Sequence, residues 1–368
     1  MLIFPYSNFS IFKLTQFIPL SYYTLLNLFK TKEKSKKFNH LLYSCFERVI
    51  QQNRQTKFDD TIIVIDDTAY RKRMRKNPSV SKQYIGNIGK VDNGCCHVFS
   101  ANLKIKNKVF KKRGKIPYKA LRNNTKIFMS GFKTYNSSKS KGVVEGKYEY
   151  KSKIEIAIEL IRDEWMKAKR LGLKITHIVF DSWYPSKKLL NFIILLGLKF
   201  VCEVKKNRKI KYKGKSMRVG DLVTIATREK YFNVILPEVG EVVLFFMKDR
   251  TSGRLKAFIT NDFESPMEKV RLIARIRYMI EYCFKQMKSY LNMGKFHFTN
   301  PERVEVYITY VMLLYNFYEY LLQLGILKRQ FGCTTLDGLK VVLNKEFIQN
   351  HMNTVKPAIF KALRKKMM

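Results

Sequence analysis

Two apolar runs that each end in aspartate constrain the fold of this chain more than any other feature of its sequence. The run Thr61–Asp67 (TIIVIDD) is apolar up to its two final carboxylates, and Ile175–Asp181 (ITHIVFD) repeats the pattern. Such runs are typical of strands that are buried on both faces of a sheet. Between them, Ile154–Leu171 carries apolar residues at helical spacing and stops at Gly172. This order of strand, helix and strand predicts an α/β sheet with an acidic site at one edge.

The charge of the chain limits the partners that it can have. Among its 368 residues, 71 are Lys or Arg and 29 are Asp or Glu, which gives a formal net charge of +42. Hydrophobic residues make up 46% of the chain, enough to offset chain entropy, so a disordered basic tail protein is excluded. A folded protein with this charge requires a polyanionic partner. Nucleic acid is the first candidate, and an acidic membrane surface is the alternative.

The lengths of the apolar runs argue against a membrane protein. A spanning helix needs roughly 18 or more apolar residues without charge. The stretch Leu14–Phe29 is shorter and contains Pro19, and Val306–Tyr318 is bounded by Glu305 and Glu319. No basic residues precede the first apolar stretch, as they would in a signal peptide. We therefore expect a cytoplasmic, nucleoid-associated protein without a membrane partner.

Changes in composition and in the spacing of apolar residues divide the chain into five parts. Residues 1–58 have apolar positions at helical spacing, which predicts a small helical N-terminal region, a candidate for DNA binding. Residues 59–199 are expected to form the first part of the α/β core, and residues 200–262 a β-rich segment. Residues 263–328 would supply the remaining core helices, and residues 329–368 a basic tail.

Further elements are predicted within these parts. Cys95–Ile105 alternates as a strand does, and the basic stretch Lys106–Lys153 has the composition of a surface loop. In Phe200–Asp262, short β-branched and aromatic runs alternate with Gly and Lys turns, which predicts a separate β-rich block. Two long helices are expected after this block, at Pro266–Leu291 and Val304–Leu324.

Three carboxylates stand out by their context. Asp67 and Asp181 each end an apolar run, and Glu281 lies within a basic helical segment. Any one of them could simply satisfy a turn or a helix end. Three acids that converge at a sheet edge are costly unless a divalent cation neutralises them, and ligands that are all oxygen favour Mg²⁺ or Mn²⁺. Two such ions would support an in-line phosphoryl displacement.

A second pattern surrounds Glu281. Arg277 precedes it by 4 residues and Lys288 follows it by 7, which places all three on one face of a helix. That face presents a carboxylate between two cations. The alternative is an ordinary Arg–Glu pair on a solvated helix, worth about a few tenths of a kcal/mol.

The six cysteines indicate neither a disulfide framework nor a zinc ribbon, because no two of them form a CxxC pair. Cys95, Cys96 and His97 are adjacent, but neighbours on a strand point to opposite faces of the sheet. We expect reduced thiols.

Taken together, these residues resemble the three signatures of the DDE transposases, most closely those of the insertion-sequence-four family. The matching strings are Asp66-Asp67-Thr68, Phe180-Asp181-Ser182-Trp183-Tyr184 and Arg277-x3-Glu281-x6-Lys288. The family's third signature begins with a tyrosine, and this chain has Ala274 in that place. The resemblance spans residues 60–325. It implies an RNase H-like core with a β-rich insertion between the second Asp and the Glu, where residues 200–262 lie.

The resemblance also implies chemistry for the matched residues. Asp67, Asp181 and Glu281 would be the catalytic residues and the ligands of two Mg²⁺ or Mn²⁺ ions, with Asp66 as a one-residue alternative to Asp67. The family cleaves DNA by water attack, and the freed 3′-OH then acts as the nucleophile of strand transfer. Its substrate is double-stranded DNA with terminal inverted repeats, and we expect a homodimer in the DNA complex.

Several further residues are expected to contact DNA. By the resemblance, Arg277 and Lys288 hold phosphates of the cut strand. The other expected DNA-binding residues are Trp183, Tyr184, Lys205, Lys206, Arg208 and Lys209. The last four open the run Lys205–Lys215, in which Tyr212 is interleaved with cations as a phosphate-tracking surface requires. Three other basic runs are explained equally well as solvated loops: Arg71–Lys76, Lys104–Lys119 and Lys361–Lys366.

Two questions stay open at the level of sequence. Hairpin-forming relatives hold a flipped base on a tryptophan of the β insertion, but Trp165 and Trp183 both lie outside it here, so another aromatic residue would have to substitute. The candidates are Tyr231, Phe232, Phe245 and Phe246. The chain could also be an inactive or domesticated DNA-binding derivative, or an RNase H-like nuclease without strand transfer. The intact carboxylates argue against the first of these.

Overall fold

A computed structural model describes residues 58–72, 77–86, 88–106, 117–225, 231–249, 252–296 and 299–323, and the single residues 328, 329, 332 and 338. The chain divides into two compact units. The larger unit takes in residues 50–284 and 299–301, and the smaller takes in residues 1–49, 285–298 and 302–368. Apart from single positions, the predicted N-terminal region (residues 1–58) and the predicted basic tail (residues 329–368) lie outside the described residues.

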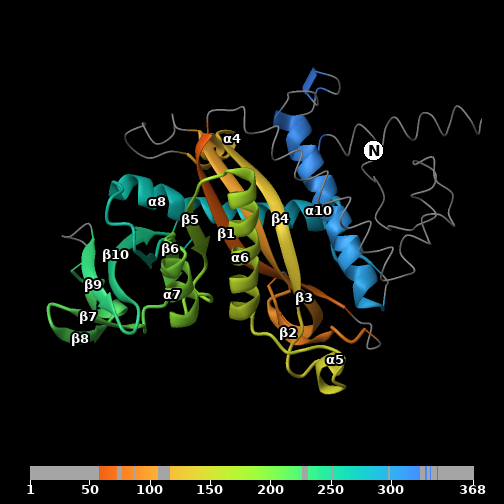
Figure 1. Cartoon of the computed structure of the whole chain (residues 1–368), viewed down its shortest axis with the longest axis horizontal. Coiled ribbons are helices and arrows are strands. Elements are labelled where there is room, and N and C mark those ends of the chain that lie inside the picture. The colour runs from red at the N-terminus through yellow and green to blue at the C-terminus, as the bar shows by residue number, and fades with distance from the viewer. Residues whose placement is uncertain are drawn as a thin grey trace, which may run out of the picture. The chain divides into compact units, whose positions relative to one another are not determined.

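One mixed sheet organises the larger unit (Figure 1). In the described part of the chain, its strands follow the order β2-β3-β1-β5-β6-β11-β10-β9-β7-β8, and β4 pairs with β3. The strands are β1 (Phe58–Arg71), β2 (Ser81–Ile85), β3 (Lys90–Lys106), β4 (Thr125–Tyr135), β5 (Ile175–Phe180), β6 (Lys199–Val204), β7 (Lys209–Tyr212), β8 (Lys215–Arg218), β9 (Phe232–Leu236), β10 (Gly240–Lys248) and β11 (Leu255–Thr260).

The apolar run that begins at Thr61 makes β1 the centre of this sheet, as predicted. Residues Ile62 to Ile65 are 0% exposed, because β1 is paired on both edges and packed on both faces. On one edge it pairs antiparallel with β3, and on the other it pairs parallel with β5, with Ile65 opposite Phe180. The predicted strands at Ile175–Asp181 and Cys95–Ile105 are confirmed as β5 and β3.

Seven helices are described in the two units. Those described are α4 (Tyr118–Asn123), α5 (Lys141–Val144), α6 (Lys153–Leu171), α7 (Lys187–Leu195), α8 (Met267–Ile276), α9 (Tyr278–Tyr290) and α10 (Pro301–Gln323), with a 3-10 turn at Val219–Leu222. The predicted helix at Ile154–Leu171 is α6, which starts with a capping box between Ser152 and Glu155 and ends at Gly172, whose φ is 60°. Figure 1 shows α6 and α7 side by side against the sheet, where they share one apolar core with β1, β5 and β6.

Two predictions about the sheet are corrected. Lys106–Lys153 was expected to be a loop, but it contains β4, which pairs antiparallel with β3 from Ile105↔Thr125 to Cys96↔Tyr135. Its apolar centre forms a strand, and the lysines at both ends of the segment hid this pattern. The segment Phe200–Asp262 is rich in strands as predicted, but it is no separate block. Its first strand, β6, pairs parallel with β5, and β11 pairs with β6, so the whole segment continues the central sheet.

The helix expected at Pro266–Leu291 is in fact two helices, α8 and α9, that meet at Arg277. The helix expected at Val304–Leu324 is confirmed as α10. Within the smaller unit, α10 is tied to the chain before it by Tyr307, whose hydroxyl donates to the carbonyl oxygen of Asn292 at 2.8 Å. None of the helices in the described ranges is long and apolar enough to cross a membrane.

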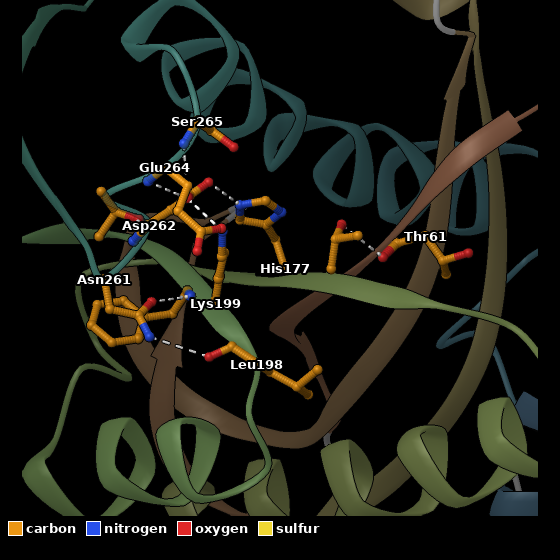
Figure 2. Close-up of polar contacts among 11 residues, drawn as sticks. Thr61, His177, Leu198, Lys199, Asn261, Asp262, Glu264 and Ser265 are labelled. Atoms are coloured by element: carbon orange, nitrogen blue, oxygen red, sulfur yellow. Dashed lines mark hydrogen bonds and ion pairs between the residues drawn. The ribbon is translucent and has the colours of Figure 1, made fainter.

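A buried carboxylate joins three strands at the end of the sheet where β5 and β6 begin (Figure 2). Asp262 follows β11, and its side chain is 0% exposed. It accepts hydrogen bonds from His177 Nε2 at 3.0 Å and from Lys199 Nζ at 2.7 Å, the residues that stand opposite each other where β5 and β6 begin. The backbone N–H groups of Glu264 and Ser265 also donate to it, at 3.2 and 3.1 Å. Asp262 therefore fixes the turn that leads from β11 into α8.

We predict that Asp262→Asn lowers the free energy of unfolding by about 3 kcal/mol, because it removes the buried carboxylate that pairs with Lys199 and is hydrogen-bonded to His177. Burial alone would raise the pKa of Asp262, but the bonds from His177, Lys199 and Ser265 outweigh it and hold the pKa well below its ordinary 3.8. The stabilisation is therefore complete above about pH 4 and declines as the pH falls from there toward the pKa of the folded state. Urea unfolding across this pH range measures both effects.

The matched control is Glu264→Gln, since Glu264 pairs with the same Lys199 at 2.6 Å but its side chain is 85% exposed. We expect a change within about 0.5 kcal/mol for this variant. Equal losses in the two variants would contradict the central role of Asp262.

Candidate active site

Strands β1 and β5 bring two aspartates near each other. The strands are parallel and their pairing ends with Ile65 opposite Phe180, so Asp66 and Asp181 each follow this last pair, Asp66 within β1 opposite Phe99 of β3 and Asp181 just beyond β5. Residues paired in this way point to the same face. Asp66 is 8% exposed, and Asp181 begins the loop that follows β5.

Arg277 links this pair of strands to the third predicted acid. Its Nη1 lies 3.3 Å from Asp66 Oδ2 and 2.7 Å from Glu281 Oε1, which it meets one helical turn along the chain. Arg277 is 6% exposed, whereas 48% of the Glu281 side chain is exposed. The Arg277–Glu281 pair is therefore not an ordinary surface pair, because the same guanidinium also neutralises a buried carboxylate on β1.

Burial is the main influence on the pKa values of two of these carboxyl groups. Burial raises the pKa of Asp66 well above its usual range, and Asp181, Asp67 and Glu281 raise it further, against the opposing effect of Arg277. Burial also raises the pKa of Asp181, against the backbone N–H of Trp183 that it accepts. A cation among these groups would restore the ionised forms.

Asp67 makes different contacts from those of its neighbour. Its carboxylate accepts bonds from Lys153 Nζ at 2.6 Å and from the Tyr184 hydroxyl at 2.9 Å, and the Cys96 thiol lies 3.4 Å away. Lys153 is the first residue of α6, Tyr184 lies in the loop between β5 and α7, and Cys96 lies on β3. Asp66 and Asp67 thus have separate partners, as expected of consecutive residues on a strand.

The predicted convergence of three acids is met only in part. In the part of the chain that the structure describes, no three Asp, Glu, His or Cys side chains are gathered closely enough to hold a metal ion. Asp66 and Glu281 are bridged by Arg277, and Asp67 is held by Lys153. The donors themselves fit Mg²⁺ or Mn²⁺, since they are carboxylate oxygens, and a divalent cation would favour the ionised forms that burial opposes at Asp66 and Asp181.

The residues expected to bind DNA fall into two groups. Lys205, Lys206 and Lys209 are exposed, and Trp183 is 72% exposed. The others are engaged within the protein, and none of them is fully exposed. Tyr184 is 1% exposed with its hydroxyl on Asp67, so its side chain offers no surface to DNA, and Arg208 is half-buried with Nη1 donating to the carbonyl oxygen of Pro185. Lys288 lies in the last turn of α9, within the smaller unit, and its phosphate contact stays a prediction.

The aromatic residues proposed to substitute for the missing tryptophan of the insertion are mostly unsuitable. Phe232, Phe245 and Phe246 are 2%, 0% and 9% exposed and belong to the packed interior, so they cannot stack on a base. Tyr231 is 49% exposed. Phe232 is buried on the inner face of β9, whose residues alternate between buried and exposed, whereas β10 is buried on both faces from Val242 to Phe246.

Among the basic runs with no assigned role, Lys104 is buried and Arg71 is paired with Asp92 at 2.6 Å. The centres of Arg71–Lys76 and Lys104–Lys119, and all of Lys361–Lys366, lie outside the described residues.

The Cys-Cys-His string forms no metal site. Cys96 contacts Asp67, whereas His97 Nε2 is hydrogen-bonded to the Tyr70 hydroxyl on another side of β3. Burial lowers the pKa of His97 to about 3, so the ring is neutral. None of the four described cysteines forms a disulfide, as predicted.

Lys153 and Tyr184 are functional candidates whose roles sequence reasoning missed. Burial opposes the charge of Lys153, but Cys96 and Asp67 outweigh it and raise its pKa, so Lys153 stays a cation beside the site. Lys153 lies 86 residues from Asp67 in the chain, and no local pattern signals such a pair. The position of Tyr184 three residues after Asp181 was visible, but its burial was not.

Comparison with known proteins adds sequence matches over this region. Residues 152–317 match the family described as "Transposase DDE domain", and residues 45–218 match "DDE superfamily endonuclease". A relative from Microchaete diplosiphon, described as "Probable transposase for insertion sequence element IS701", is 23% identical over 272 residues, which is 69% of this chain. The matched region spans 64% of that relative's length. These similarities are compatible with the insertion-sequence-four family without singling it out.

We predict that Arg277→Leu lowers the free energy of unfolding by about 3–5 kcal/mol, because it leaves the buried carboxylate of Asp66 without its cation. Mg²⁺ should restore more stability to this variant than to the original protein, since a divalent cation supplies the missing charge. Urea unfolding with and without MgCl₂ measures both quantities.

Lys285→Leu is the control, because it removes an exposed cation from α9, the helix that begins directly after Arg277, and we expect a change within about 0.5 kcal/mol. If Mg²⁺ stabilised the Arg277 variant no more than the original protein, the carboxylates beside Arg277 would not form a cation site.

Proposed function

Since the chain belongs to the DDE transposases, we propose that it cuts the ends of a mobile DNA element and joins them to a target by phosphoryl transfer. The observation that best supports this activity is the placement of Asp66 and Asp181 directly after the last residue pair of two parallel strands, with Glu281 bound to the same arginine as Asp66. Clustered carboxylates in a chain of charge +42 suit metal-assisted cleavage of a phosphodiester.

The proposal must choose between two consecutive aspartates. The sequence signature favours Asp67, with Asp181 and Glu281, as the ligands of two Mg²⁺ or Mn²⁺ ions. The contacts favour Asp66, because it follows the last β1–β5 pair, as Asp181 does, and shares Arg277 with Glu281. We therefore assign Asp66, Asp181 and Glu281 as the ligand set and Asp67 as a residue that positions the end of β1. Bound ions would polarise the phosphodiester and activate the attacking water or 3′-OH.

The cations of the site would hold the scissile strand. A guanidinium has five N–H donors, so Arg277 can keep a carboxylate and still bind a phosphate oxygen. Lys288 and the exposed lysines Lys205, Lys206 and Lys209 would bind phosphates farther along the DNA. Their task is to position the substrate and not to transfer a proton.

The expected partner is double-stranded DNA that ends in terminal inverted repeats, bound by two copies of the chain. Two rival functions are outcomes of the same tests. A nuclease without strand transfer would cut the repeat but fail to join it to a target. An inactive or domesticated derivative would bind DNA without cutting it.

We predict that Asp66→Asn, Asp181→Asn and Glu281→Gln each abolish Mg²⁺-dependent cleavage of terminal-repeat DNA while leaving binding largely intact, because affinity comes mainly from Lys and Arg contacts. Asp67→Asn should retain measurable cleavage, since this residue is assigned a positioning role. A gel assay of cleavage, paired with a binding assay, separates the two properties.

Normal cleavage by the Asp66 variant, together with loss of cleavage by the Asp67 variant, would return the ligand role to Asp67. Normal cleavage by the Asp181 or Glu281 variant would overturn the active site as a whole.

We predict that Lys288→Ala weakens binding to terminal-repeat DNA and lowers the slope of log K against log salt by about 0.9, the value for one lost phosphate contact. A salt titration of binding measures the slope. Lys174→Ala is the control, because Lys174 is an exposed cation at the other end of the sheet, just before β5 begins. An unchanged slope for Lys288→Ala would identify Lys288 as a lysine that takes no part in DNA binding.

A further inference from the structure

Trp183 is an exposed aromatic residue beside the candidate active site. It follows Asp181 by two residues, and it is 72% exposed. The second tryptophan of the chain, Trp165, packs against the apolar core, and Lys169 Nζ lies 3.7 Å from the centre of its ring. The ring of Trp165 is therefore partly covered by the core and by Lys169, whereas the ring of Trp183 is exposed to a ligand.

The loop that carries Trp183 is held at several points. The backbone N–H of Trp183 donates to Asp181 Oδ1 at 2.9 Å. The next residue, Tyr184, is buried with its hydroxyl on Asp67 Oδ1 at 2.9 Å, and Arg208 donates to the carbonyl oxygen of Pro185. These contacts hold the backbone on both sides of Trp183, and its side chain remains exposed beside Asp181.

Two lysines from different elements flank the ring. Lys153 Nζ, at the start of α6, lies 5.9 Å from the ring centre, and Lys205 Nζ, just after β6, lies 5.3 Å away. Both distances are near the outer limit of about 6 Å for a cation–π contact. The ammonium groups are therefore close enough to reach a ligand on the ring without covering it.

An open aromatic face between cations is the arrangement with which proteins bind single-stranded nucleic acid, because the ring stacks on a base and the cations bind the backbone. We propose that Trp183 stacks on an unpaired base of the bound DNA, while Lys153 and Lys205 contact phosphates next to that nucleotide. The inference rests on the proposed function, since it requires DNA at the carboxyl ends of β1 and β5. A base within a duplex is excluded as the ligand, because its faces are covered by its neighbours.

Intrinsic fluorescence tests this inference directly, because the chain has only two tryptophans. In the full-length Trp165→Phe protein, all tryptophan emission comes from Trp183, and in Trp183→Phe it comes from Trp165. A single-stranded oligothymidine should quench the first protein saturably and leave the second unchanged. The absence of quenching in the Trp165→Phe protein at saturating oligothymidine would overturn the proposal.

Affinity gives a second readout. Trp183→Ala should weaken oligothymidine binding about 5- to 100-fold, the range for loss of one stacked base, while Trp183→Phe keeps an aromatic face and should lose less. Binding of a fully paired duplex should be nearly unaffected by either substitution. The matched control is Leu195→Ala, because Leu195 is an equally exposed apolar residue (81%) on α7. A loss of the same size for Leu195→Ala would show that the effect is not specific to the ring.

The outcomes separate this inference from the proposed function. If the protein binds neither duplex nor oligothymidine, both fail. If it binds and cuts terminal-repeat DNA while Trp183 shows no quenching, only the stacking site fails. If polyglutamate quenches Trp183 as strongly as oligothymidine does, the surface is a general polyanion site and the base-stacking inference is wrong.

Discussion

The parallel pairing of β1 with β5 is the interaction on which the rest of this structure depends. It sets Ile65 opposite Phe180 and so delivers Asp66 and Asp181 together to the carboxyl edge of the sheet. A shift of one residue would move one of the two acids to the opposite face. Register here is strongly specified, because β1 is buried on both faces and paired on both edges. The positions of the two acids therefore rely on the apolar packing of the residues that directly precede them.

That pairing has an electrostatic cost, which the chain meets with its own cations. Asp66 is buried beside other carboxylates, and Arg277 is the cation that faces it. Burial opposes the charge of Arg277, but Asp66 and Glu281 outweigh it and raise the pKa of the guanidinium. Asp67 is paired with a different cation, because Lys153 Nζ lies 2.6 Å from its Oδ2. Both aspartates of the first signature are thus neutralised from within the protein, each by a different helix or helix junction.

Local patterns predicted much of this fold, because the strands at Thr61 and Ile175 and the helix between them are buried and regular. Features that depend on which strands pair, and in which register, could not be predicted from local patterns. The choice between Asp66 and Asp67 requires the register of β1 against β5, and the continuity of the β-rich segment with the core requires the partner of β6. The strand β4 was missed because lysines at its ends masked a short apolar centre. Asp262 contacts His177 and Lys199, which lie 85 and 63 residues away in sequence, so no local motif predicts these contacts.

The continuity of the sheet has a mechanical consequence. Strands β11, β10, β9, β7 and β8 extend outward from β6 through an unbroken series of backbone hydrogen bonds, so this part of the sheet cannot swing as a hinged lid. Any adjustment to an incoming substrate must then come from the connecting loops and from side chains. Strands β7 and β8 lie farthest from β1 on this side of the sheet, so a change of side chain there leaves the ladder between β1 and β5 undisturbed.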